Sequence, residues 1–128
     1  MSSHGRFATA INCMDGRVQM PANEWIRKKF SVDYIDTITE PGPNKILAEN
    51  KDSAAINSIK QRVAISVNKH GSRCIAVLGH HDCAGNPVDK ESQLAHIKSA
   101  VKTVNSWGFL VQTIGLWVDE NWQVNEVK

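Results

Sequence analysis

The sequence lacks any apolar stretch approaching the roughly 20 residues that a membrane-spanning helix needs. Its first ten residues, MSSHGRFATA, also lack the charged start and hydrophobic middle of a secretion signal. These two absences argue against membrane insertion and export. The protein is therefore expected to be cytoplasmic and to have no membrane partner.

An excess of charge of one sign is also missing. The chain has 15 Lys and Arg against 13 Asp and Glu, a net charge of +2. The longest basic run, Arg27 to Lys29, falls on a predicted helix. Because nucleic-acid binding requires a concentrated basic patch, this pattern gives no support for a nucleic-acid partner.

Cysteine is scarce, with Cys13, Cys74 and Cys83 as the only three. An odd number of cysteines in a chain without an export signal argues against a disulfide framework. No C-x-x-C pair is present, which makes a redox thiol protein the weakest interpretation. The thiols are therefore expected to be buried, free or bound to metal.

What is present fits a single domain spanning residues 1–128. At 128 residues and 41% hydrophobic residues, the chain is long enough to bury about two-thirds of its unfolded surface in one core. No internal repeat, linker or low-complexity segment divides it.

The first third of the chain predicts a strand, a helix and a second strand. FATAINC (Phe7–Cys13) is a short apolar run that ends at a turn, as expected of a buried strand. Pro21 suits the first turn of the helix that follows. VDYIDTITE (Val32–Glu40) alternates apolar and polar residues, and the segment 41–43, Pro-Gly-Pro, ends it.

The same alternation continues to the end of the chain. A helix is predicted before the apolar strand CIAVLGH at 74–80. Asp52 or Ser53 is its expected N-cap, and Gly71 is expected to end it. A helix ending near Gly108 follows. FLVQTIGLWV (109–118) and WQVNEV (122–127) then predict a closing hairpin.

This order of elements predicts an α/β fold. We expect a mostly parallel central sheet of four to five strands flanked by helices, with one antiparallel strand at its C-terminal edge. Ligands of such sheets bind beyond the carboxyl ends of the strands, where the topology reverses. Cys13 ends the first predicted strand and His80 ends the third, so both should lie at that edge.

Cys13, His80 and Cys83 form a donor set that suits zinc, and three protein ligands leave a fourth position for water or substrate. Asp15 could accept the proton of that water or orient it, and Arg17 could hold Asp15 by a bidentate pair. A freed Asp15 could instead occupy the fourth position itself. An isolated H-x-x-C is a weak signal, and its occurrence with a second motif at another strand end strengthens it.

The other candidate ligands have simpler interpretations. Cys74, on an apolar strand, is expected to be a core residue. His4, His70 and His96 are more typical of surface or capping positions than of metal sites.

The segments Cys13–Arg17 and Gly79–Gly85 resemble the paired signatures C-x-D-x-R and G-H-x-x-C-G of the β-class carbonic anhydrases. The resemblance implies that Cys13, His80 and Cys83 bind Zn²⁺ and that Asp15 and Arg17 form a catalytic dyad. It implies a carbonate dehydratase, in which zinc-bound hydroxide reversibly converts carbon dioxide to bicarbonate.

The resemblance also implies a homodimer or a higher homo-oligomer. The tail residues Trp117, Trp122 and Val127 could form such an interface or belong to the core. His81 is a conceivable proton shuttle, because the pKa of histidine lies near neutrality.

Two departures from the family leave the substrate open. Glu40 stands where many members carry Arg, and only 12 residues precede Cys13, so the N-terminal arm that wraps a partner subunit is expected to be missing. A hydrolase of carbon disulfide or carbonyl sulfide and a non-catalytic zinc-binding protein are therefore alternatives on the same scaffold.

Overall fold

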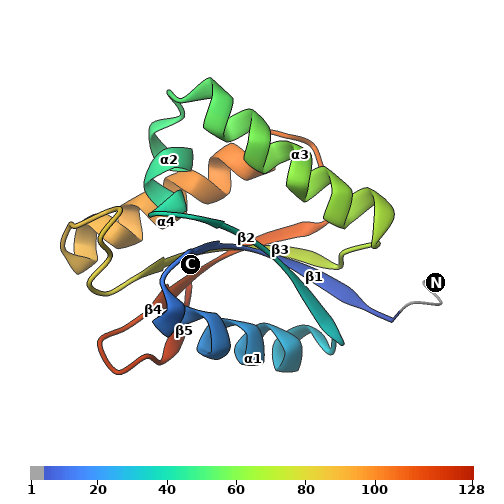
Figure 1. The fold of residues 1–128 in the computed structure, drawn as a ribbon, viewed down its shortest axis with the longest axis horizontal. Coiled ribbons are helices and arrows are strands. Elements are labelled where there is room, and N and C mark those ends of the chain that lie inside the picture. Colours follow the sequence, from blue (N-terminus) through green and yellow to red (C-terminus); the bar gives the residue numbers. More distant parts are fainter. Residues whose placement is uncertain (1–4) are drawn as a thin grey trace.

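A computed structural model of the chain describes residues 5–128. Strands and helices alternate along it (Figure 1). Their bounds are β1 (Phe7–Cys13), the short 3₁₀ helix η1 (Gly16–Val18), α1 (Gln19–Phe30), β2 (Tyr34–Glu40), α2 (Pro43–Glu49), α3 (Ser53–Lys69), β3 (Cys74–His80), α4 (Lys90–Asn105), β4 (Gln112–Val118) and β5 (Val124–Val127).

The strands form one five-stranded sheet in the order β2-β1-β3-β4-β5. All neighbouring pairs are parallel except β4 and β5, which are antiparallel. This arrangement confirms the predicted fold class. Because β2 lies on one side of β1 and β3 on the other, the topology reverses between β1 and β3, where open α/β sheets bind ligands.

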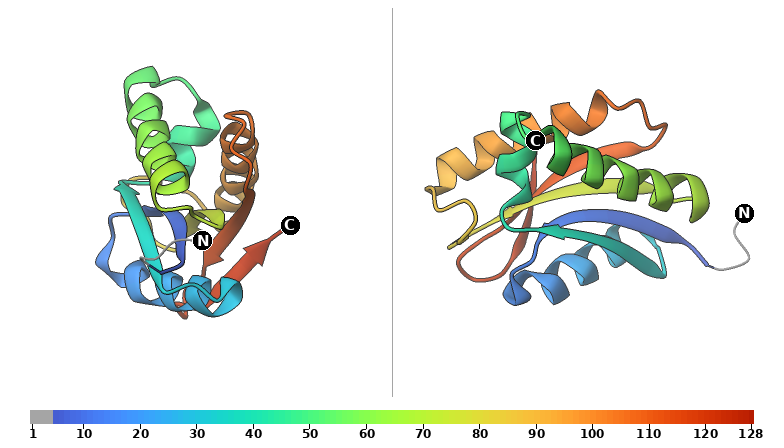
Figure 2. Two further views of the ribbon diagram at one scale, coloured as in Figure 1. Left: turned by 90° about the vertical axis from the view of Figure 1, so that its right-hand side faces the viewer. Right: turned by 45° about the horizontal axis from the view of Figure 1, so that its top comes forward.

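The helices lie on both faces of the sheet, α1 on one and α2, α3 and α4 on the other (Figures 1 and 2). Right-handed crossovers that run in opposite directions from β1 place their helices on opposite faces. Strand β3 is buried along its whole length. Its residues Cys74, Ala76 and Leu78 join the core on the α1 side, and Ile75 and Val77 join the other core.

Strands β1 and β3 have the predicted bounds, whereas the last two strands are shorter than predicted. Strand β4 begins only at Gln112, and Leu110, two residues before it, is 99% exposed. Strand β5 begins only at Val124. The Asp119 carboxylate accepts hydrogen bonds from the backbone N–H groups of Asn121 and Gln123, which extends the turn.

Helix α2 corrects the sequence prediction, which placed only the end of a strand at Pro41, Gly42 and Pro43. Gly42 has a φ of 61°, a left-handed conformation that glycine adopts without penalty, and Pro43 follows in the first turn of the helix. The fixed φ of proline is already suited to a helix start. The same residues that end β2 therefore begin α2.

The predicted boundaries of α3 agree with the structure, whereas α4 ends at Asn105, three residues before the predicted stop at Gly108. The Asp52 side chain caps α3 by accepting the backbone N–H of Ala55 at 3.0 Å, and Gly71 follows the helix with a φ of +65°.

Trp117 is 4% exposed, which places this tail residue in the core of the monomer. None of the helices within residues 5–128 has both the length and the apolar character that crossing a bilayer requires.

Candidate metal centre

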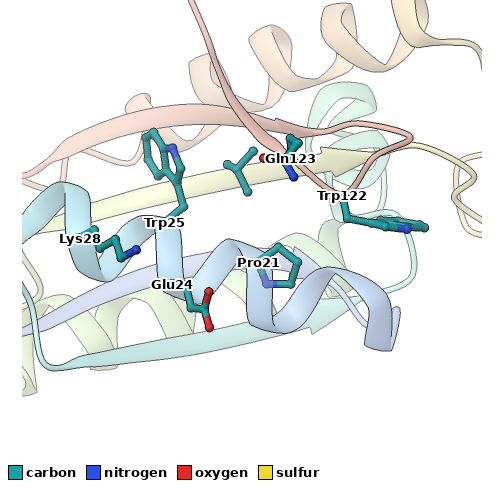
Figure 3. Close-up of a pocket in the computed structure, with 7 residues that line it drawn as sticks. Pro21, Glu24, Trp25, Lys28, Trp122 and Gln123 are labelled. Atoms are coloured by element: carbon teal, nitrogen blue, oxygen red, sulfur yellow. The ribbon is translucent and has the colours of Figure 1, made fainter.

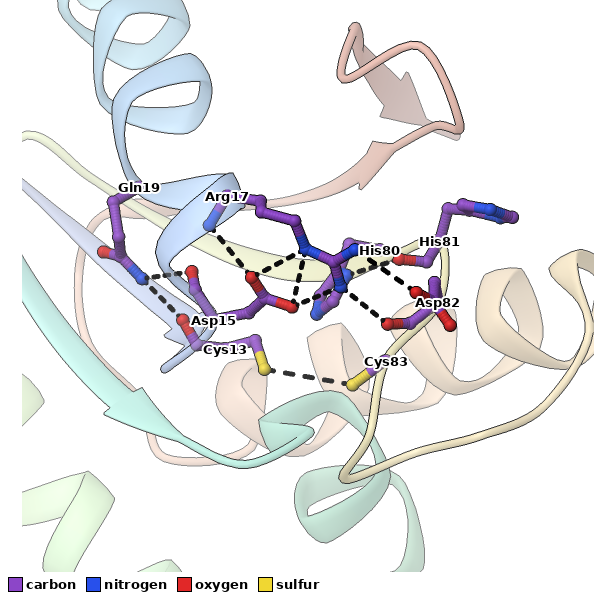
Figure 4. Close-up of polar contacts among 8 residues, drawn as sticks. All are labelled: Cys13, Asp15, Arg17, Gln19, His80, His81, Asp82 and Cys83. Carbon is purple, nitrogen blue, oxygen red and sulfur yellow. Dashed lines mark hydrogen bonds and ion pairs between the residues drawn. The ribbon is translucent and has the colours of Figure 1, made fainter.

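The site is formed by two strand ends that are adjacent in the sheet but distant in the sequence. Cys13 is the last residue of β1 and His80 is the last residue of β3, which pairs with β1. Cys83 lies in the turn that follows β3. Figure 4 shows these side chains converging beyond the carboxyl ends of the strands, as the sequence predicts.

The three side chains are close enough to share one metal ion. The Sγ atoms of Cys13 and Cys83 are 3.9 Å apart, and with the His80 imidazole all three ligand atoms lie within 4.8 Å of one another. Each residue is at most 4% exposed. Two zinc–thiolate bonds of about 2.3 Å at a tetrahedral angle would place the sulfurs about 3.8 Å apart, so the observed spacing fits zinc.

His80 presents one unused nitrogen. Its Nδ1 lies 2.7 Å from the backbone carbonyl oxygen of His81, so Nδ1 carries the proton and donates it. Its Nε2 is buried and has no hydrogen-bond partner. A backbone carbonyl that fixes the tautomer of a histidine in this way is the usual support for a metal-ligating imidazole.

The two thiols are within hydrogen-bonding distance of each other. Their contact lowers the pKa of Cys13 and raises the pKa of Cys83. Burial lowers the pKa of His80, but contact with Cys13 and the His81 carbonyl outweighs it, so the net shift is upward. Negative charge is therefore favoured on the Cys13 sulfur, and a thiolate is the form that binds metal.

Asp15 and Arg17 form a bidentate pair beside Cys13. The Arg17 guanidinium donates to the Asp15 carboxylate from Nε at 3.1 and 3.2 Å and from Nη2 at 2.7 Å. These hydrogen bonds lower the pKa of Asp15 to about 2 and raise the pKa of Arg17. The Asp15 carboxylate also accepts the backbone N–H of Arg17 at 2.9 Å, which caps η1.

Two amide side chains that the sequence interpretation missed hold the end of β1. The Asn12 side chain accepts the backbone N–H of Cys13 at 2.8 Å and donates to the carbonyl of Val18. The Gln19 amide donates to the carbonyls of Cys13 at 2.7 Å and Asp15 at 3.2 Å. Asn12 and Gln19 flank the Cys13–Arg17 motif, and that proximity is the only sequence signal that could have identified them.

Backbone segments pack tightly on the other side of the site. A Cβ atom at Gly85 would lie 2.4 Å from the carbonyl carbon of Pro41 and 2.7 Å from the nitrogen of Gly42. The turn after Cys83 is therefore in direct contact with the loop between β2 and α2. Glu40, which precedes this loop, forms an ion pair with Arg62 of α3.

The remaining candidates lie apart from the three ligands. His81 is exposed, and its ring points away from them (Figure 4). Cys74 is fully buried, and burial raises its pKa to about 12, as expected of a core thiol. His70 contacts the Asp36 carboxylate and His96 the Asn86 amide, while His4 lies outside the described residues.

Comparisons with known proteins identify what the chain resembles. A family model described as "putative carbonic anhydrase" matches residues 3–128. One solved structure that matches is the β-carbonic anhydrase CafA of the fungus Aspergillus fumigatus, with 13% sequence identity and a TM-score of 0.49. The match covers 98% of this chain and 76% of CafA. No curated protein sequence matches.

Proposed function

Because this chain belongs to the family described as putative carbonic anhydrases, we propose that it is a zinc-dependent carbonate dehydratase that interconverts carbon dioxide and bicarbonate. The observation that carries the proposal is the convergence of Cys13, His80 and Cys83, with the buried Nε2 of His80 left without a partner. This donor set suits zinc and leaves one position for water or substrate.

When bound, zinc would act as a Lewis acid that lowers the pKa of a coordinated water to about 7. Asp15 stays negatively charged under these conditions, because Arg17 holds its pKa at about 2. A carboxylate with so low a pKa does not keep a proton at neutral pH. We therefore assign Asp15 to accepting a hydrogen bond and orienting the reacting water, while buffer takes up the released proton.

Arg17 controls where the Asp15 carboxylate lies. The guanidinium contacts both carboxylate oxygens, and one of them, Oδ1, also accepts the backbone N–H of Arg17. In the structure, Asp15 is held by Arg17 and is not among the three residues that could bind one metal ion, Cys13, His80 and Cys83. This arrangement supports the active form, in which the fourth position is open to water and not closed by Asp15.

The first test is zinc content per chain in protein purified under reducing conditions without added metal. The proposal predicts about one zinc per chain in the native protein and none in Cys83→Ala. Cys74→Ala, which removes the third thiol far from the site, is the matched control and should keep its zinc. Native reduced protein without zinc would contradict the proposal.

The reaction itself is tested by stopped-flow hydration of carbon dioxide between pH 7 and 9, the range in which a zinc-coordinated water ionises. The native protein should exceed the buffer rate, and Cys83→Ala should not. A zinc-loaded protein that does not exceed the buffer rate is not a carbonate dehydratase. Release of sulfide from carbonyl sulfide or carbon disulfide by that protein would then assign it to the alternative substrates.

A further inference from the structure

Arg17 has two contact partners besides Asp15, namely Asp82 and Trp122. Besides its contacts with Asp15, its guanidinium donates from Nη1 to the Asp82 carboxylate at 3.2 Å and from Nη2 to the Asp82 backbone carbonyl at 3.0 Å (Figure 4). Its central carbon also lies 4.7 Å from the centre of the Trp122 ring. Such a distance is typical of a cation–π contact.

The two additional partners adopt an uncommon backbone conformation. Four non-glycine residues within residues 5–128 have a positive φ: Ser31, Asn50, Asp82 and Trp122. Ser31 and Asn50 are the C-caps of α1 and α2, where a left-handed residue is common. Asp82, with a φ of 57°, and Trp122, with a φ of 58°, cap no helix, and both contact Arg17.

Trp122 is fixed by its surroundings. It packs against the core on the α1 side and lines a pocket of about 310 Å³ between α1 and the start of β5. Figure 3 shows it at the end of this pocket farther from Trp25 and Lys28. A strained backbone persists only where surrounding contacts hold it. Here those contacts place an indole against Arg17.

Asp82 lies between two of the candidate metal ligands, His80 and Cys83. Arg17 lies in the segment that carries the third ligand, Cys13. The contact between Arg17 and Asp82 therefore joins the two chain segments that supply the ligands, which are separated by 65 residues in the sequence. Within residues 5–128, no other ion pair joins these two segments.

Building on the proposed zinc site, we propose that Asp82 is a positioning residue. It holds Arg17 from the side opposite Asp15, which keeps the Asp15 carboxylate in place and fixes the turn that carries His80 and Cys83 relative to Cys13. Trp122 supports the same guanidinium through its ring. Asp82 acts through Arg17 and touches neither substrate nor metal.

The test replaces Asp82 by Asn, which keeps the size of the side chain and tolerates the left-handed conformation. Asp89→Asn is the matched control, because Asp89 belongs to the same loop but contacts only the start of α4. The first readout needs no metal: hydrogen exchange of the Arg17 Nε–H, followed by NMR in metal-free protein. Exchange should be about fivefold faster in Asp82→Asn and unchanged in Asp89→Asn, the size expected for an exposed ion pair.

The second readout is zinc affinity from chelator competition. Asp82→Asn should bind zinc about five- to tenfold more weakly than the native protein, as expected when a support outside the ligand set is lost. The same substitution should have no further effect in an Arg17→Gln background. A double-mutant cycle separates this indirect role from a direct effect of the Asp82 charge on the metal.

Three outcomes decide the question. Unchanged exchange in Asp82→Asn overturns the positioning role. An equal loss of zinc affinity with and without Arg17 also overturns it, because Asp82 would then act by its own charge. If the native protein binds no zinc, the proposed function fails, while the exchange measurement still decides whether Asp82 holds Arg17.

Discussion

At the scale of single residues, the three thiols differ in what surrounds them, although all are buried. Burial alone raises the pKa of Cys74 to about 12, whereas the Cys13 thiol has its pKa lowered by its neighbour Cys83. We expect iodoacetamide to modify Cys13 well before Cys74 in chelated, reduced protein at pH 8. Peptide mass mapping measures this, and bound zinc should slow the modification of Cys13 at least tenfold.

Cys74 should react only when denaturant unfolds the sheet, because the thiolate is the reactive form and Cys74 is fully buried. Denatured protein, in which all three thiols should react, is the control. Modification of Cys74 in the native state at a rate similar to Cys13 would contradict the assignment of Cys74 to the core.

The contacts of individual residues were predicted only in part. The bidentate pair of Asp15 and Arg17 was predictable because only Gly16 separates them in one short motif. The contacts of Arg17 with Asp82 and Trp122 were not, because they depend on left-handed backbone conformations in two distant turns. No periodicity or spacing in the sequence carries that information.

At the scale of elements, the turn after β3 and the loop before α2 are in contact through Gly85. Gly85→Ala would place a methyl group 2.4 Å from the Pro41 carbonyl carbon, and backbone atoms cannot rotate away as a side chain can. We expect a loss of about 1–3 kcal/mol in the free energy of unfolding, measured by urea denaturation of metal-free protein.

Gly16→Ala is the control for this prediction. Gly16 also lies beside the site, but a Cβ atom there has nothing within 4 Å. Its effect should stay within about 0.5 kcal/mol of the native protein. Equal stabilities of the two variants would show that the loop before α2 moves freely relative to the turn.

The start of α4 gives a prediction for pH. The Asp89 carboxylate accepts the backbone N–H of Ser92 at 2.9 Å, and hydrogen bonding from Ser92 lowers the pKa of Asp89. A group whose pKa is lower in the folded state stabilises the fold above its unfolded pKa of about 3.9. This contribution is lost as the pH falls through the folded pKa.

We therefore expect Asp89→Asn, which keeps a good cap, to melt close to the native protein at pH 7. Between pH 5 and pH 2 the melting temperature of the variant should fall less than that of the native protein. Circular dichroism of both proteins over this range measures the difference. A parallel fall of both melting temperatures would contradict a charged cap at Asp89.

Strand and helix positions were predictable where the sequence pattern determines them. The continuous apolar run from Cys74 to Leu78 requires burial on both faces, which only a central parallel strand provides. Helix α2 was missed because Pro41, Gly42 and Pro43 favour a turn as strongly as a helix start. Its buried residues, among them Asn44 and Leu47, become apparent only once α2 is packed against the sheet.

At the scale of the whole molecule, the candidate ligands connect the two central strands. Cys13 ends β1 and His80 ends β3, and these neighbouring strands separate the two hydrophobic cores. Separating them would expose both cores, so zinc held by these residues should stabilise the whole fold against unfolding. Binding to the folded state alone stabilises a protein by RT ln(1 + [L]/Kd).

At a free zinc concentration 100 times Kd, this relation gives about 2.7 kcal/mol, or roughly a 10 °C rise in melting temperature for a chain of this size. Scanning calorimetry with and without chelator should show this difference for the native protein and for Cys74→Ala. Cys83→Ala should melt at one temperature under both conditions. A native protein that binds zinc but melts at the same temperature after chelation would show that the metal sits on a locally unfolding loop and not across the central strands.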